Sequence, residues 1–312
     1  MIPISRSGSI KINNHFKDVF TSLSKRIKYV IKNGARVRGA TCNASIVNAR
    51  FLKRLNTEPF LKRLITASPE DIDKIISIFI NFDADIKLKS NNLNQLLTAI
   101  FINTEYPKMD NTKFLKRLEI DTCPYCNRNY IYSLSKSSKI KPELDHFYPK
   151  SKYPFLGLSF YNLIPSCQTC NGYGAKHEFD PFIEGLKSPY LINDNDFLFT
   201  YLLKRLDYLS PLEGNSSVSI RFKKKVAGNN KILKLTKLYN KHGDHILELI
   251  VKAKLNYSDD YREYLSSYNG LTFTDTEIDR LLIGNYTSLS ELHKRPFSKL
   301  YRDIALELGL II

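Results

Sequence analysis

Two Cys-x-x-Cys pairs in the middle of the chain constrain its fold more than any other feature. They are Cys123-Pro-Tyr-Cys126 and Cys167-Gln-Thr-Cys170, with 40 residues between them. One such turn lets two thiolates approach a metal ion from the same side, and two turns complete the tetrahedral sulfur shell that Zn²⁺ prefers. Four cysteines leave no open position on the ion. We therefore expect a structural zinc site made by Cys123, Cys126, Cys167 and Cys170.

Thiol redox chemistry is an alternative use of these pairs. One Cys-x-x-Cys pair could serve it, but two pairs in a chain with five cysteines are harder to explain in that way. In the cytoplasm, paired cysteines bind metal more often than they form disulfides. Redox chemistry is therefore the least favoured hypothesis. The fifth cysteine, Cys42, stands apart, and we expect it to be a buried packing residue.

The composition is typical of a folded, water-soluble protein. The 312 residues suffice for two or three domains, and 43% of them are apolar and 25% charged. No run approaches the roughly 20 apolar residues that a membrane span needs. The N-terminal sequence MIPISRSGSIKINNHF lacks the apolar core of a signal peptide. We expect a cytoplasmic protein that does not associate with membranes.

Positive charge is concentrated in the first part of the chain, whose formal net charge is +16 overall. Residues 1–118 carry 21 Lys and Arg against 9 Asp and Glu, which is +12. Residues 119–190 (8 against 7) give +1, and residues 191–312 (18 against 15) give +3. A polyanion suits such a basic region, because each neutralised phosphate releases condensed counterions. Many Lys- and Asn-rich proteins are basic without binding nucleic acid, so charge alone leaves the question open.

Local patterns predict a mainly helical region over residues 1–118. Apolar spacing predicts a helix from Phe16 to Lys32 that stops at Gly34. The sequence Ser68-Pro69-Glu70-Asp71 is a strong helix start, with a capping side chain, a proline at the first helical position and acids that face the helix dipole.

The later regions differ from each other. Residues 119–190 hold four of the five cysteines and short strand-like runs such as NYIYSL and FYNLI. Helical patterns return from about residue 191, where Thr274-x-x-Glu277 and Ser288-x-x-Glu291 are candidate capping boxes. The basic cluster RFKKK at 221–225 is expected in an exposed loop or at a strand edge.

The string FLKRL occurs at 51–55, 60–64 and 114–118, and LLKRL occurs at 202–206. The irregular intervals exclude a structural repeat. The strings predict amphipathic helices that carry a basic dyad beside an apolar stripe. We favour a solvated helix face over direct phosphate contact for these dyads.

Residues between the cysteine pairs carry the chemistry of phosphodiester cleavage. That reaction needs a base for water and a stabiliser for the charge that develops on phosphate. A neutral imidazole has the right unperturbed pKa for the first task. Asp and Asn oxygens are suited to Mg²⁺ or a similar ion for the second. Asp145, His146 and Asn171 supply this set.

The order Asp-His, then Asn-Leu at 162–163, then Asn directly after the last cysteine resembles the HNH nuclease motif. The resemblance covers residues 120–185 and implies a strand, loop, strand and short helix. By this resemblance His146 is the general base, and Asp145 and Asn171 bind one catalytic Mg²⁺ or Mn²⁺. Asn162 ties the loop between the strands so that His146 is oriented.

The geometry of a strand adds a condition to this assignment. Neighbouring residues on a regular strand face opposite sides, so Asp145 and His146 are expected where the strand ends, shortly before Pro149. One feature departs from the family pattern. Many relatives carry a lysine three residues after the last Asn, where this chain has a glycine. Lys150 and Lys176 are candidate phosphate contacts, and His177 is a candidate neighbour of the metal.

The segments CPYCNRNYI, LDHFYPKSKYPF, LSFYNLIPSCQTCN and KRPFSKLYRDI resemble those of bacterial HNH proteins paired with ATPases. The family that they resemble is the HNH subunit of Septu-type anti-phage defence, which is also found attached to some retrons. The resemblance implies a complex with a partner ATPase that restrains or licenses the nuclease. It leaves DNA and RNA, including tRNA, open as substrates.

These observations predict an α+β fold in which a small zinc-bound ββα-metal module, residues 119–190, is inserted between two mainly helical regions. The regions are a basic N-terminal one, 1–118, and a C-terminal one, 191–312. The predicted function is that of a metal-dependent HNH endonuclease. The alternative is a non-catalytic zinc module that binds nucleic acid or scaffolds a complex. Such a module would share the cysteines and the charge but would not need Asp145, His146 and Asn171 together.

Overall fold

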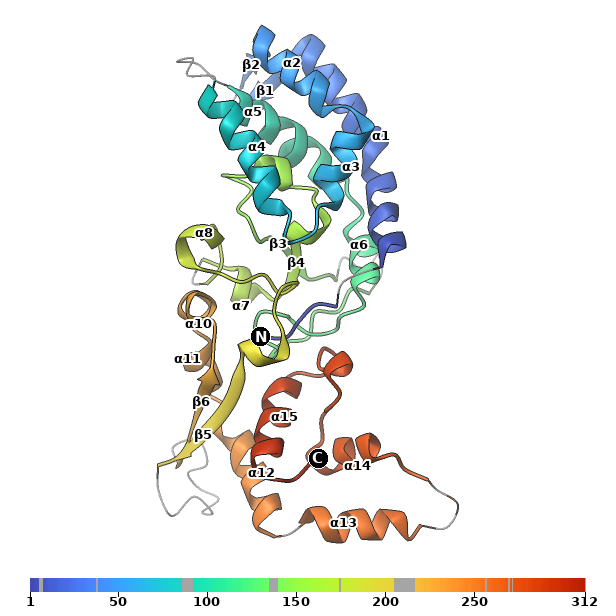
Figure 1. The fold of residues 1–312 in the computed structure, drawn as a ribbon, viewed down its shortest axis with the longest axis vertical. Helices are drawn as coiled ribbons and strands as arrows, with labels where there is room; N and C mark the ends of the chain where they lie inside the picture. Colours follow the sequence, from blue (N-terminus) through green and yellow to red (C-terminus); the bar gives the residue numbers. More distant parts are fainter. Residues whose placement is uncertain are drawn as a thin grey trace.

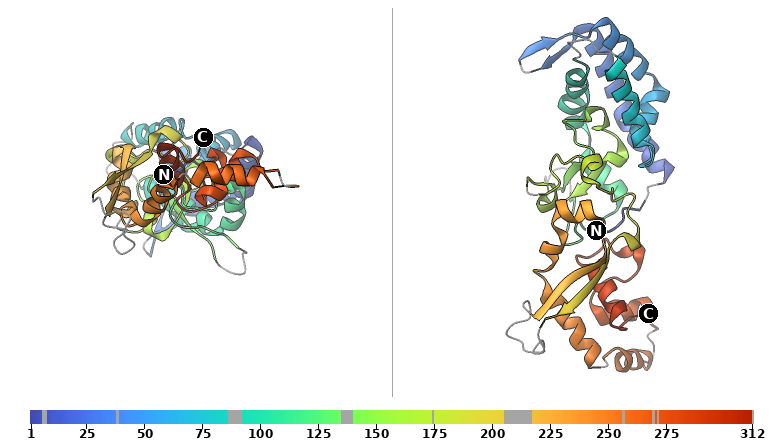
Figure 2. Two further views of the ribbon diagram at one scale, coloured as in Figure 1. Left: turned by 90° about the horizontal axis from the view of Figure 1, so that it is seen from below. Right: turned by 60° about the vertical axis from the view of Figure 1, so that its left-hand side comes forward.

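The computed structural model describes the chain apart from residues 6–7, 38, 86–91, 135–139, 174, 205–216, 256, 269, 271 and 312. The molecule is elongated, with the first helices at one end and the last helices at the other (Figure 1). The elongated outline persists after rotation about the long axis (Figure 2). Over this described part of the chain, mostly helical elements and three two-stranded antiparallel sheets make an α+β fold. Among the described residues, no helix combines the length and apolar character needed to cross a membrane.

Helices dominate the N-terminal end. They are α1 (Ser9–Asn33), α2 (Ile46–Leu55), α3 (Glu58–Thr66), α4 (Ile72–Asp85), α5 (Leu93–Leu97), the π-helix η1 (Thr98–Glu105), η2 (Tyr106–Lys108) and α6 (Asn111–Leu118), with β1 (Ala35–Val37) paired to β2 (Ala40–Cys42). The prediction for α1 is confirmed, because residues at helical spacing from Phe16 to Val30 are buried and Gly34 ends the helix at φ +70°. Helix α4 begins at Ile72, three residues after Pro69, the predicted first helical position.

The middle of the chain contains a short hairpin. Strand β3 (Glu143–His146) runs antiparallel to β4 (Leu163–Ser166), with His146 opposite Leu163. The other elements here are η3 (Pro154–Leu156), η4 (Phe160–Asn162), the one-turn helix α7 (Gln168–Asn171) and α8 (Pro181–Glu184). The run FYNLI is half 3₁₀ turn and half strand. In NYIYSL the described residues form only the isolated bridge between Thr122 and Tyr130, so the prediction of a strand there is wrong.

The C-terminal end contains η5 (Asp194–Asp196), β5 (Leu198–Leu203), β6 (Val218–Lys224), α10 (Ala227–Leu233), α11 (Leu235–Tyr239), α12 (Gly243–Lys254), α13 (Tyr257–Ser266), α14 (Asp275–Ile283), η6 (Leu289–Glu291) and α15 (Ser298–Glu307). Thr274 caps α14 in the predicted capping box with Glu277. The prediction for Ser288 is wrong: a single 3₁₀ turn follows it, without a side-chain cap. The basic cluster lies mostly on strand β6.

The predictions for the FLKRL-type strings and for Cys42 are confirmed only in part. The three FLKRL strings lie in α2, α3 and α6, as predicted, but Leu202 and Leu203 of LLKRL end strand β5. The rest of that string from residue 205 lies outside the described residues. Cys42 is half-buried rather than buried, and Asn92 Nδ2 donates a hydrogen bond to its sulfur at 3.0 Å.

The first residues of the chain return to its middle, where the N-terminus lies in Figure 1. The backbone N–H of Ile2 donates to the carbonyl of Pro124, and that of Ile4 donates to the carbonyl of Pro189, both at 3.0 Å. The N-terminal helices pack on the hairpin loop as well, for example through the stacked rings of Phe79 and Phe155. Apolar packing therefore joins the helical end to the hairpin.

Candidate metal centre and adjoining pocket

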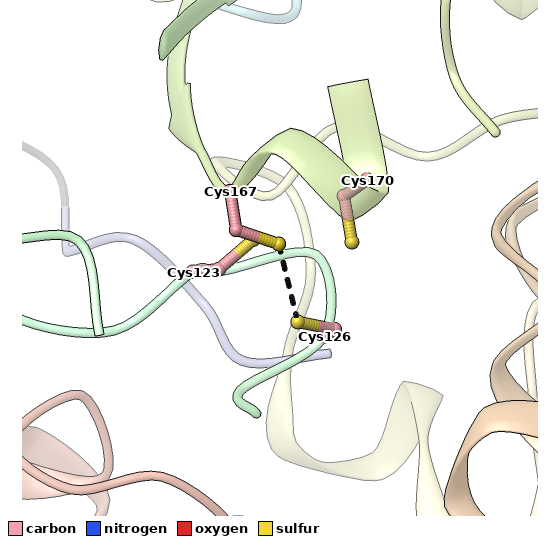
Figure 3. Close-up of side chains that lie close together, drawn as sticks. All are labelled: Cys123, Cys126, Cys167 and Cys170. Atoms are coloured by element: carbon pink, nitrogen blue, oxygen red, sulfur yellow. Dashed lines mark hydrogen bonds between the residues drawn. The ribbon is translucent and has the colours of Figure 1, made fainter. Parts of the chain in front are cut away.

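The two Cys-x-x-Cys turns meet at one point, as Figure 3 shows. The sulfur atoms of Cys123, Cys126, Cys167 and Cys170 all lie within 4.8 Å of one another. Those of Cys126 and Cys167 are 3.9 Å apart. Zinc–sulfur bonds of about 2.3 Å at tetrahedral angles separate neighbouring sulfurs by about 3.8 Å. The four cysteines could therefore hold a zinc ion, and both their number and their spacing fit it.

Hydrogen-bond donors surround this sulfur cluster. The backbone N–H of Arg128 donates to Cys126 Sγ at 3.4 Å, and Asn129 Nδ2 donates to Cys167 Sγ at 3.2 Å. Burial raises the pKa of the Cys123 thiol, because a thiolate is costly away from water. A divalent cation offsets that cost. Such donors and such burial fit a site that keeps thiolates for a metal.

The C-terminal segment KRPFSKLYRDI, residues 294–304, forms hydrogen bonds with the residue that directly follows the first cysteine turn. Asn127, which follows Cys126, accepts at Oδ1 from the backbone N–H of Lys299 at 3.1 Å and donates from Nδ2 to the carbonyl of Leu292 at 3.0 Å. Asn127 adopts φ +48°, a conformation that asparagine tolerates better than most residues. The hydroxyl of Tyr239 donates to the carbonyl of Cys126. The sulfur cluster and helix α15 are thus directly connected.

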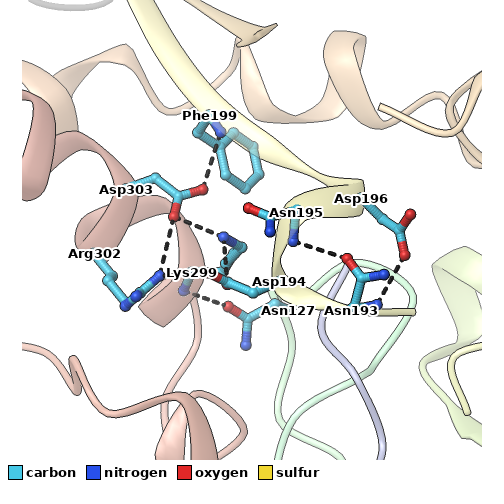
Figure 4. Close-up of polar contacts among 9 residues, drawn as sticks. All are labelled: Asn127, Asn193, Asp194, Asn195, Asp196, Phe199, Lys299, Arg302 and Asp303. Carbon is cyan, nitrogen blue, oxygen red and sulfur yellow. Dashed lines mark hydrogen bonds and ion pairs between the residues drawn. The ribbon is translucent and has the colours of Figure 1, made fainter. Parts of the chain in front are cut away.

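Lys299 extends this connection into an ion network, shown in Figure 4. Its side chain is buried, and its ammonium lies 2.7 Å from carboxylate oxygens of both Asp194 and Asp303. Asp303 also accepts from the backbone N–H of Phe199 in strand β5 at 3.0 Å. A buried charge is tolerable when it is paired and hydrogen-bonded in this way. Three charged residues of this segment, Lys299, Arg302 and Asp303, belong to the network.

A pocket of about 190 Å³ opens beside the hairpin. Asp145 and His146 line it from the end of β3, as expected from strand geometry, and Asn171 lines it from the end of α7. The rest of the wall consists of Leu144, Pro149, Lys150, His177 and Glu178. The structure therefore brings Asp145, His146 and Asn171 to one cavity, although they come from segments 25 residues apart.

Asp145 is almost completely buried, with 3% of its surface exposed. Its Oδ2 accepts a hydrogen bond from the Tyr125 hydroxyl at 2.6 Å and lies 3.9 Å from Lys176 Nζ. Burial raises the pKa of this carboxyl, and the charge of Lys176 opposes the rise. Tyr125 could not be identified from the sequence alone, since a tyrosine inside a Cys-x-x-Cys turn has no defined direction before the fold is known.

His146 has a defined tautomer. Its Nε2 lies 3.1 Å from the carbonyl oxygen of Gly157. A carbonyl only accepts hydrogen bonds, so Nε2 carries the proton and Nδ1 is the basic nitrogen. Burial lowers the pKa of His146 from 6.5 to about 4, so the imidazole is neutral at pH 7. The Tyr106 ring packs against it, with ring centroids 4.7 Å apart.

Asn162 is fully buried at the end of η4, directly before β4, and binds the loop that connects the strands. Its Oδ1 accepts from the backbone N–H of Tyr148 at 2.7 Å. Its Nδ2 donates to the carbonyls of Tyr148 at 3.3 Å and Leu156 at 3.0 Å. Leu156 precedes Gly157, whose carbonyl holds His146. The contacts of Asn162 are thus with the loop that orients the imidazole.

Asn171 and Glu143 form a second polar pair at the pocket. Asn171 Nδ2 donates to Glu143 Oε2 at 2.8 Å. Glu143 was not among the residues selected from the sequence. It lies two residues before Asp145, however, and residues at that spacing share a face of a strand. That spacing is the signal that could have identified it.

The two candidate phosphate contacts differ in position. Lys150 lines the pocket and is exposed. Lys176 is only 1% exposed, and its Nζ also lies 3.5 Å from the carbonyl of His146. The structure places Lys176 beneath the pocket as the partner of Asp145, not at a surface where it would meet a phosphate. Charge pairing with the buried carboxylate explains this position.

Comparison with known proteins gives one distant relationship. A stretch of 108 residues, 34% of the chain, is 32% identical to the Septu protein PtuB of Bacillus thuringiensis. The match covers 38% of that protein's length, so the similarity concerns a part of each chain. No protein-family model matches the sequence, and no solved structure matches it.

Proposed function

We propose that this chain is a metal-dependent HNH endonuclease that hydrolyses phosphodiester bonds in DNA or RNA. The observation that carries the proposal is the shared pocket of His146, Asp145 and Asn171. The neutral imidazole, with Nε2 anchored on Gly157, leaves Nδ1 as the base. Nucleic acid is the substrate because the chain has a net charge of +16 and the pocket has Lys150 at its wall.

Each residue at the pocket has a separate role in the proposed reaction. His146 Nδ1 takes a proton from water as the water oxygen bonds to phosphorus and the P–O bond to the leaving oxygen breaks. Asp145 and Asn171 would hold Mg²⁺ or Mn²⁺, which supplies positive charge to the phosphate oxygens. Lys176 and Tyr125 keep the Asp145 carboxylate in place. Asn162 acts through the loop that carries Gly157. A zinc ion on the four cysteines is structural in this proposal.

The biological role that we propose is that of a nuclease effector in an anti-phage defence complex with a partner ATPase. The similarity to a Septu protein over a third of the chain supports it. The alternative is a non-catalytic zinc module. It is favoured by the burial of Asp145, which already has Lys176 and Tyr125 as partners, as in a purely structural ion pair.

A matched pair of histidine variants separates these two functions. His15 resembles His146 closely: it is buried, its Nε2 lies 2.8 Å from the carbonyl of Leu158, and burial lowers its pKa to about 4. Glutamine in either position keeps a donor for the carbonyl but cannot act as a base. We expect His146→Gln to lower Mg²⁺- or Mn²⁺-dependent cleavage at least about 100-fold, while His15→Gln retains it.

Both variants are expected to keep the zinc content of the wild type in metal analysis. Equal cleavage by His146→Gln and His15→Gln, measured on protein free of contaminating nuclease, would remove His146 as the base. Absence of cleavage by the wild type with any polymer, with and without the partner ATPase, would favour the non-catalytic module.

A further inference from the structure

Tyr173 is the most exposed large hydrophobic side chain among the described residues, with 89% of its surface accessible. It lies two residues beyond Asn171. One face of its ring stacks on His177, with centroids 4.1 Å apart and the planes inclined by 27°. His177 itself lines the pocket that contains Asp145 and His146. A flat aromatic surface therefore faces solvent at the margin of the candidate active site.

Backbone hydrogen bonds anchor the two residues that precede His177. The N–H of Lys176 donates to the carbonyl of Cys170 at 2.9 Å, and the N–H of Ala175 donates to the carbonyl of Gly172 at 3.0 Å. Both side chains between the rings, Ala175 and Lys176, are buried. The residues directly before His177 are thus anchored to the second cysteine turn, and Tyr173 stacks on the His177 ring.

His177 occupies a strained position. Its φ is +34°, in the region that non-glycine residues rarely adopt. Such conformations persist when the surroundings enforce them, and they are concentrated at functional sites. Glycine would adopt this backbone more easily. The chain carries an imidazole there instead, and this ring is the one that stacks on Tyr173.

Nucleobases are the ligands that this surface fits. Tyr173 is too exposed to serve the core, and it does not line the pocket, so it takes no direct part in proton transfer. Exposed aromatic rings beside a basic site stack on bases of single strands, whatever the base, because every base has a flat face. In a duplex both faces of an internal base are already covered. Only an unpaired base can reach Tyr173.

We propose that Tyr173 and His177 form a stacking platform for an unpaired nucleobase next to the phosphate in the Asp145–His146 pocket. The substrate of the site is then a single-stranded, looped or flipped-out stretch of nucleic acid rather than regular duplex. This inference rests on the proposed function and names the substrate class for it. Lys150, on the pocket wall, is placed to meet the backbone of the same strand.

Binding of labelled oligonucleotides tests the platform without requiring cleavage. Affinity is measured without added Mg²⁺ or Mn²⁺, for single-stranded DNA, single-stranded RNA and duplex DNA of one sequence. We expect Tyr173→Ala to raise the Kd for single strands roughly 5- to 150-fold, the equivalent of one base–aromatic stack of about 1–3 kcal/mol. Tyr173→Phe should keep the wild-type affinity, since the flat ring is retained. Duplex binding should be the same in all variants.

Tyr264 provides the matched control. It is 55% exposed and contacts another tyrosine ring, Tyr268, at a centroid distance of 5.5 Å. It lies in α13, at the opposite end of the molecule from α1 and well away from β3 (Figure 1). Tyr264→Ala should leave single-strand binding unchanged. His177→Gly should weaken it without lowering thermal stability, because glycine relieves the strained φ.

Abasic substitutions identify the base that stacks. Removing that base should weaken wild-type binding as much as Tyr173→Ala does, and it should have no further effect on that variant. The proposal is overturned if Tyr173→Ala binds single strands as the wild type does, or weakens single-strand and duplex binding equally. It is also overturned if the variant loses only a protein partner. Cleavage of duplex by the wild type, with Tyr173→Ala unaffected, would refute the platform and leave the proposed function intact.

Discussion

Asn162→Ala is the substitution that best tests how the loop between β3 and β4 supports the pocket. The side chain has no solvent exposure and makes three hydrogen bonds to the backbone of that loop. Two of them fix Tyr148, near the end of β3, and the third fixes Leu156, next to the carbonyl that holds His146. Alanine removes all three and leaves a small space.

The cost follows from those contacts. The loss of two bonds to carbonyls costs about 0.5–1.5 kcal/mol each, and the buried N–H of Tyr148, left without its acceptor, costs about 1–3 kcal/mol more. The sum, roughly 2–6 kcal/mol, is a large part of the roughly 5–15 kcal/mol by which a typical domain is stable. Catalysis should suffer as well, because a displacement of His146 by about 1 Å can lower kcat about 100-fold.

Urea unfolding and steady-state cleavage measure the two effects. Ser159→Ala is the control: the Ser159 hydroxyl is buried nearby and donates one hydrogen bond, to the carbonyl of Leu64 at 2.8 Å. It should cost about 1 kcal/mol and leave kcat unchanged. Asn162→Ala should lower kcat with little change in KM at a temperature where it is folded. A kcat equal to that of Ser159→Ala would refute the positioning role.

Two further predictions concern stability. Burial lowers the pKa of His15 to about 4, so between pH 6.5 and 4 the unfolded chain binds more protons and the free energy of unfolding falls as the pH falls. From pH 7 to pH 5 the free energy of unfolding falls by about 2 kcal/mol through His15. His15→Gln should remove this contribution when urea unfolding is measured at both pH values. An unchanged pH dependence would contradict the lowered pKa of His15. Cys123→Ser removes one of the four sulfur ligands from a site whose zinc can contribute on the order of 10 kcal/mol to folding. This variant should therefore be insoluble or protease-sensitive. The control variant Cys42→Ser should keep its zinc. A soluble, folded and zinc-free Cys123→Ser protein would argue against the metal clamp.

Elements with strong local signals could be predicted from the sequence. Helix α1 follows from apolar spacing and a terminal glycine, and α14 follows from its capping box at Thr274. The string LLKRL shows where local signals fail. Its first two residues resemble those of the helical strings, but they are paired with Ser219 and Val218 of β6. Pairing with the distant strand β6 determines the structure of these two residues, and the local sequence carries no information about that pairing.

The candidate site divides in the same way. The cysteines could be selected because the spacing of each pair is a local property, and Asp145 and His146 because they are adjacent. Tyr125 could not, since its hydroxyl meets a carboxylate 20 residues away only after folding. Lys176 illustrates a different difficulty. A lysine near a nuclease motif suggests a phosphate contact, but the fold buries this one beside Asp145. Burial depends on the packing of the whole region.

The cysteine turns do more than join the ends of the hairpin, because each carries part of the pocket. The first turn contains Tyr125, which donates to the Asp145 carboxylate. The second is followed at once by Asn171, and the carbonyl of Cys170 fixes the backbone of Lys176. The two partners of Asp145, Tyr125 and Lys176, thus take their positions from the cysteine turns, and so does Asn171 on the pocket wall. A metal ion on those sulfurs would stiffen the pocket and not only the fold, because both cysteine turns carry residues that contact Asp145 or line its pocket.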